Sequence, residues 1–123
     1  MIFYIGFGQL IEKLKLDLND PRSLRETTEA ENLQSNISQA SLFLVGPELI
    51  NPVRFVQRIF AIDSHISIII LTAPVQLTKV KQTLNFSPFV GKNTLCIAYR
   101  ENINFNEIFN DAILRNAAKT KLL

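Results

Sequence analysis

Short apolar runs alternate along the chain with longer stretches that are apolar on one side only. The runs at 2–5, 41–45, 66–71 and 94–99 are rich in branched and aromatic residues, which predicts four buried strands. The run at 66–71 is almost continuously branched, as is typical of a strand covered on both faces. Residues 24–28 form a weaker candidate for a further strand.

The intervening stretches place apolar residues three or four positions apart, which is the spacing of one helix face. In the first stretch, Leu14, Leu16 and Leu18 also alternate, so an extended second half is an alternative there. The spacing predicts helices over 9–18, through Leu33 and Ile37, from Asn51 to the turn at 63–65, over 75–86 and over 105–119.

Two helix starts carry specific signals. Asn51 is a favourable N-cap, and Pro52 at the first helical position gives up only an N–H group that would have no partner. Thr28 and Glu31 have the spacing of a capping box, which predicts a short helix after residue 28.

Strands that alternate with helices predict a parallel sheet with helices on both faces, since each right-handed crossover must return across the sheet. The sequence therefore predicts an α/β fold in a single domain over residues 1–123. Its 123 residues are 47% hydrophobic and 20% charged, which supports a packed core and excludes a disordered or coiled-coil chain.

Composition narrows the function classes only a little. A formal net charge of +2 is too weak to indicate nucleic-acid binding, and the single cysteine excludes an intrachain disulfide scaffold or a cysteine-based zinc site. We find no signal-peptide pattern and no apolar run of about 20 residues, so we expect a cytoplasmic domain without membrane contact.

Several isolated features have plain structural interpretations. Gly6 and Gly8 could begin a dinucleotide-binding fingerprint, but Ile11 stands where the third glycine is needed, so a tight strand-to-helix turn is favoured. His65 is interpreted as a solvated turn residue and Cys96 as a small apolar strand residue. Lys79, Lys81 and Lys92 form a modest basic patch, which is interpreted as solvated lysines rather than a nucleic-acid surface.

The segments 40–63 (ASLFLVGPELINPVRFVQRIFAID) and 66–74 (ISIIILTAP) resemble the third strand and helix and the fourth strand of response-regulator receiver domains. The resemblance covers essentially the whole chain. It implies a three-layer, doubly wound, flavodoxin-like fold with a five-stranded parallel sheet in the order 2-1-3-4-5.

The functional residues of that family are largely replaced here. Receivers hold Mg²⁺ with an acidic pair after the first strand and accept phosphate on an aspartate after the third. The resemblance places Gly6 and Phe7 at the acidic pair, Gly46 at the aspartate, Thr72 at the hydroxyl after the fourth strand, and Arg100 at the lysine after the fifth. Since a phosphorylated carboxylate requires a nucleophile and a held cation, we expect a pseudo-receiver without catalysis, metal or cofactor.

The resemblance implies a signalling domain that binds a protein partner or a following module, such as a sensor histidine kinase, and that pairs as a homodimer. The implied interaction face contains Val80, Phe86, Phe89, Val90, Phe105 and Phe109. One alternative is a nucleotide or anion sensor in the vacated phosphorylation pocket near Gly6, Gly46 and Thr72. Another is an ordinary phosphorylated receiver using Glu48 or Asp63.

Overall fold

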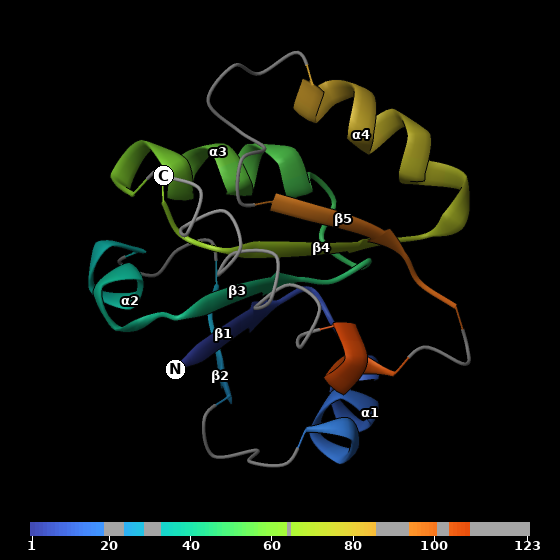
Figure 1. Cartoon of the computed structure of the whole chain (residues 1–123), viewed down its shortest axis with the longest axis horizontal. Coiled ribbons are helices and arrows are strands. Elements are labelled where there is room, and N and C mark those ends of the chain that lie inside the picture. Colours follow the sequence, from blue (N-terminus) through green and yellow to red (C-terminus); the bar gives the residue numbers. More distant parts are fainter. Residues whose placement is uncertain (19–23, 29–32, 64, 86–93, 101–103, 109–123) are drawn as a thin grey trace.

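The fold is known from a computed structural model, which describes residues 1–18, 24–28, 33–63, 65–85, 94–100 and 104–108. Five parallel strands form one sheet in the order β2-β1-β3-β4-β5, as Figure 1 shows. This confirms the predicted α/β class and strand order. The strands are β1 (Ile2–Ile5), β2 (Leu24–Glu26), β3 (Leu42–Val45), β4 (Ile68–Thr72) and β5 (Thr94–Ala98).

Helices cover both faces of this sheet (Figure 1). The helices α2 (Leu33–Gln39), α3 (Pro52–Ile62) and α4 (Leu77–Asn85) pack on one face, and α4 follows a 3₁₀ turn, η2 (Pro74–Gln76). On the other face lie α1 (Leu10–Asp17) and a helical turn at residues 105–108. The remainder of the helix predicted over 105–119 lies outside the described residues.

Strand alternation divides the core into two apolar layers. Phe3, Phe43 and Ile70 face α2, α3 and α4, and the rings of Phe3 and Phe43 stack with centroids 5.4 Å apart. Leu44 and Ile69 face α1 instead. Every residue of β3 and β4 is buried, as expected for central parallel strands.

The start of α3 follows the sequence prediction. The Asn51 side chain accepts a hydrogen bond from the Arg54 N–H at 3.2 Å, and Pro52 occupies the first helical position. This cap fixes the direction in which the chain enters α3 at the carboxyl edge of the sheet. The capping box predicted at residues 28–31 falls largely outside the described part of the chain.

The short edge strand β2 is attached by polar contacts as well as by its ladder. The Thr27 N–H donates to the Tyr4 carbonyl at 2.9 Å, and the Asn36 amide of α2 donates to the Thr27 hydroxyl at 3.0 Å. Both side chains are buried. Because a buried hydrogen bond is costly to break, this pair helps to hold a three-residue strand against the sheet.

The alternative of an extended second half in the first helix is wrong. Leu14 is fully buried, whereas Leu16 is 85% exposed and lies within α1. The helix predicted from residue 75 begins as η2, with Val75 exposed. No helix in the described ranges combines the length and apolar character that crossing a bilayer requires.

Candidate functional site

The ends of β1 and β3 meet through backbone alone. The Gly46 N–H donates to the Ile5 carbonyl at 2.7 Å, and the Glu48 N–H donates to the Gly6 carbonyl at 2.9 Å. These two hydrogen bonds bring the loop after β3 directly against the loop after β1. Gly6 and Gly46, the two glycines that the resemblance assigns to acidic positions, are therefore in direct contact.

Both glycines are required by the space around them. A Cβ atom on Gly46 would overlap the Gly6 carbonyl oxygen and come within 2.9 Å of the Phe7 ring. A Cβ on Gly6 would lie 2.8 Å from the Leu49 backbone nitrogen, and Gly6 has a φ of +76°, which side chains disfavour. Packed backbone therefore fills the place between Gly6 and Gly46.

Phe7 lies in the core rather than at the sheet edge. Its side chain is 2% exposed, and its ring makes edge contacts with Tyr4 and Phe105, each with a centroid distance of 6.1 Å. The sequence placed Phe7 in the vacated pocket, and this is a correction. An aromatic ring directed into the α1 face anchors the loop after β1 instead of lining a site.

Thr72, the last residue of β4, faces the α3 and α4 side of the sheet. Alternation along β4 puts its side chain on the same face as Ile68 and Ile70. Thr72 is 4% exposed, and its hydroxyl oxygen has no hydrogen-bond partner within the described structure. A buried, unpaired hydroxyl is unfavourable and so points to a missing partner.

Arg100 is exposed at the end of the described β5 segment. The N–H of the preceding residue, Tyr99, donates to the Thr72 carbonyl at 2.7 Å, so the two strand ends are adjacent. Arg100 is nevertheless absent from the described lining of the cavity beside Thr72. The structure thus brings Gly6 and Gly46 together and places Thr72 on the same cavity as Gly46. Arg100 is not among the described residues that line this cavity.

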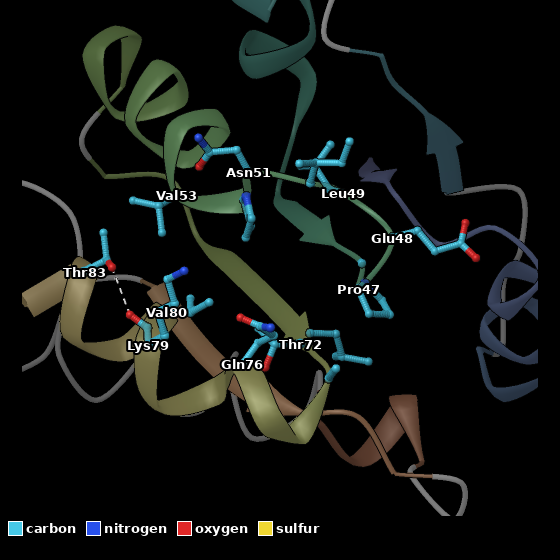
Figure 2. Close-up of a pocket in the computed structure, with 15 residues that line it drawn as sticks. Pro47, Glu48, Leu49, Asn51, Val53, Thr72, Gln76, Lys79, Val80 and Thr83 are labelled. Atoms are coloured by element: carbon cyan, nitrogen blue, oxygen red, sulfur yellow. Dashed lines mark hydrogen bonds between the residues drawn. The ribbon is translucent and has the colours of Figure 1, made fainter.

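A cavity of about 610 Å³ lies between the loop after β3 and helix α4, as Figure 2 shows. It is next to the closed glycine contact, and Gly46 and Thr72 both border it. The described lining comprises residues 46–53, residues 71–73, Gln76, Lys79, Val80 and Thr83. The ligand site that the sequence offered as an alternative near Gly6, Gly46 and Thr72 falls beside this cavity, although Gly6 is not among its described lining residues. The contribution of Lys79 was not predicted, because Lys79 was interpreted as a solvated lysine.

Two residues of the predicted interaction face are in the core. Val80 is 8% exposed and packs in the layer beneath α3 and α4, and Phe105 is fully buried against Phe7. They are apolar residues on the inward side of their helices, so placing them on an exposed face is wrong. Phe86, Phe89, Val90 and Phe109 lie outside the described residues.

His65 and Cys96 are not among the described residues that line the cavity. His65 is exposed, and its N–H donates to the Asp63 carboxylate at 2.9 Å. Burial raises the pKa of the Cys96 thiol, and the nearby Lys81 ammonium opposes this in part. Burial likewise raises the pKa of the Tyr4 hydroxyl, and nearby carboxylates add to that effect. In the described ranges, no three His, Cys, Asp or Glu residues gather as metal ligands would.

The fold and this site define a doubly wound α/β domain whose sheet edge is closed by glycine and bordered by a cavity. No protein-family model matches the chain, and no curated protein or solved structure matches it either. The function must therefore be argued from the chain's own residues.

Replacing Gly46 by alanine tests the closed contact. We expect a loss of unfolding free energy of about 3 kcal/mol, because the new methyl group meets backbone that cannot rotate away. Gly8→Ala is the control. The atoms nearest to a Cβ there belong to the flexible end of Glu48, so we expect a cost of about 1–2 kcal/mol from left-handed backbone strain. Urea unfolding measures both, and equal costs for the two variants would contradict the contact.

Replacing Thr72 by valine tests the unpaired hydroxyl. We expect the ligand-free domain to gain about 1 kcal/mol, because valine keeps the shape and removes a polar group that is buried without a partner. Thr83→Val is the matched control, since that hydroxyl is exposed and already donates to the Lys79 carbonyl at 2.9 Å. Thermal unfolding compares them. A destabilised Thr72→Val variant would mean that the hydroxyl has a partner in solution.

Proposed function

We propose that this chain is a pseudo-receiver, a non-catalytic signalling domain that acts by binding a protein partner or a covalently following module. A sensor histidine kinase is the kind of module that the resemblance implies. The proposal is supported by the strand order and by the segments around β3 and β4. The observation that carries it is the backbone contact between Gly6 and Gly46.

Phosphoryl transfer to a carboxylate requires a nucleophile at the third-strand end and oxygen ligands for a divalent cation beside it. Gly46 offers no side chain, and the backbone around it leaves no room for one. At the position of the acidic pair, one residue is glycine and the other is a buried aromatic ring. These features oppose receiver chemistry at this place and favour a role in binding.

Neither Glu48 nor Asp63, the two acids considered as alternatives, lies where a receiver carries its phosphate-accepting aspartate. The Glu48 carboxylate lies over Gly8, beside the start of α1, and is directed away from the cavity (Figure 2). Asp63 follows the C-terminal end of α3, at the opposite edge of the sheet from Gly46, where it accepts the His65 N–H. A phosphorylated receiver that uses either residue would need a different arrangement of these loops.

The binding role implies that the domain works in the cytoplasm, where its partner modules lie, and that it pairs through the side carrying α4 and β5. The exposed residues of α4 are polar and basic, including Lys79 and Lys81. Apolar contacts would come from the segment after α4, with Phe86, Phe89 and Val90.

Exposure to acetyl phosphate and Mg²⁺ tests the lack of phosphorylation. We expect the intact mass to remain unchanged, because no carboxylate stands at the third-strand end. A conventional receiver treated in parallel verifies the reagent. An added phosphoryl group that disappears in Glu48→Gln or Asp63→Asn would overturn the non-catalytic proposal.

Replacing Phe89 by glutamate tests pairing. We expect the wild-type chain to scatter light as a dimer at high micromolar concentration and the variant as a monomer, because a buried charge disfavours an apolar interface. Leu16→Glu is the control: Leu16 is 85% exposed on α1, which packs on the other face of the sheet from α4, so this variant should stay dimeric. A monomeric wild-type chain, or an unaffected Phe89→Glu variant, would contradict pairing through this segment.

A further inference from the structure

We propose that the outer side of α3 and α4 docks an acidic segment of the partner protein, whose apolar side chains enter the cavities beside Ile50. The inference rests on the proposed binding function and names the surface and the partner chemistry for it. We call this surface the α3–α4 face. It comprises the cavity between the β3–α3 loop and α4 together with Ile50, Arg54, Arg58, Lys79 and Lys81.

Ile50 lies where two cavities of the surface meet. Its side chain is 99% exposed, and it borders both the cavity of about 610 Å³ and a second, smaller cavity of about 290 Å³. A single exposed apolar residue is ordinary on a protein surface. An exposed apolar residue between two cavities is different, because a partner that covers it can also fill them.

The walls of both cavities suit aliphatic side chains. Leu49, Val53 and Val80 line the larger cavity, and Phe55 lines the smaller one. The exposed residue Gln76 also lines the larger cavity, which is therefore open to the surface (Figure 2). Protein interfaces place their apolar anchors in pockets of this kind and surround them with polar groups.

Basic residues border both cavities. Lys79 lines the larger cavity from α4 (Figure 2), and Arg54 and Arg58 line the smaller cavity from α3. Glu48 is the one acidic residue among the described lining of either cavity, and its carboxylate lies over Gly8 instead. A partner that fills these cavities therefore needs carboxylates around its apolar side chains to be complementary in charge.

The distribution of charge over the molecule shows the same asymmetry. The helices α2, α3 and α4 contain no acidic residue and four basic ones, Arg54, Arg58, Lys79 and Lys81. The whole chain has 13 basic and 11 acidic residues, so acids outnumber bases outside these helices. Positive charge gathered on one side of the sheet speeds and orients the approach of an acidic partner. Lys92 lies outside the described residues.

Other occupants fit this face less well. Two α3–α4 faces in contact would set like charges against each other, and a contact with a different face of a second copy would form open chains. Nucleic-acid single strands stack on aromatic rings, whereas the exposed apolar residue here is aliphatic. An acidic protein segment with apolar side chains matches both the charge and the cavities.

Synthetic probes test this face. The main probe is a helical peptide of about 15 residues, near the shortest length at which an isolated helix persists, with leucine on one side and glutamate elsewhere. The matched control peptide carries lysine in place of glutamate. Single-stranded DNA and phosphatidylserine vesicles are tested in parallel. We expect the glutamate peptide to bind, with amide NMR shifts at Ile50, Arg54 and Lys79 and weaker binding at higher salt.

Three outcomes with these probes would overturn the proposal. They are no binding of the glutamate peptide, equal binding of the lysine peptide, and preferred binding of DNA or vesicles over the glutamate peptide.

Charge reversal connects binding to the basic residues. Lys79→Glu and Arg54→Glu should each weaken the glutamate peptide by about fivefold, because each change removes an attraction and adds a repulsion at the surface. A carboxylate in the first turn of a helix is favourable, so the Arg54 variant should fold. Lys15→Glu is the control, since Lys15 is exposed on α1 and its reversal changes the net charge equally. Equal affinities in all three variants would contradict the docking face.

Ile50→Ser tests the apolar part of the face. We expect the glutamate peptide to bind about tenfold more weakly, because the side chain that the peptide covers is shortened and made polar. Leu16→Ser is the control, since Leu16 is also exposed but lies on α1. Unchanged affinity in the Ile50 variant would remove Ile50 and its cavities from the proposal.

The outcome is separable from that of the proposed function. A chain that resists acetyl phosphate but binds no glutamate peptide would lose only the assignment of this face. A chain that binds the peptide and is also phosphorylated would lose only the non-catalytic role.

Discussion

The contact between the Gly6 carbonyl and the Gly46 backbone determines the shape of the whole carboxyl edge of the sheet. It joins two loops that are 40 positions apart in the sequence and that follow neighbouring strands. Because each loop rests on the other's backbone, there is no room for side chains between Gly6 and Gly46. The loop after β1 turns Phe7 into the core, and the loop after β3 becomes one wall of a cavity on its far side.

Local pattern was sufficient to predict the elements but not the site. The branched runs and the Asn51-Pro52 start correspond directly to strands and to α3, since burial and capping depend on neighbours in sequence. The resemblance supplied the strand order. The sequence also showed directly that positions 6 and 46 carry no carboxylate. The sequence does not show whether the two glycines leave an open space, because that depends on how closely the two loops approach each other. The spacing of apolar residues along the chain carries no information on that distance.

The errors at Val80 and Phe105 have a related cause. Val80 lies in the helix predicted over 75–86 and Phe105 begins the helix predicted over 105–119, yet both apolar residues were assigned to an interaction face. A side chain packed against the sheet cannot also meet a partner, so an apolar position in an amphipathic helix is evidence for the inner face. The outer side of α4 is instead polar and basic, and this is the side that sequence reasoning dismissed as simple solvation.

Helix α4 connects the two proposals physically. Its inner side and Lys79 border the cavity, while the segment that follows it carries the apolar residues proposed for pairing. The opposite wall of the cavity is held by the glycine contact, whereas α4 begins at an exposed 3₁₀ turn just after Thr72. If pairing prefers one position of α4, linkage requires that the acidic segment and the second copy alter each other's affinity by the same factor.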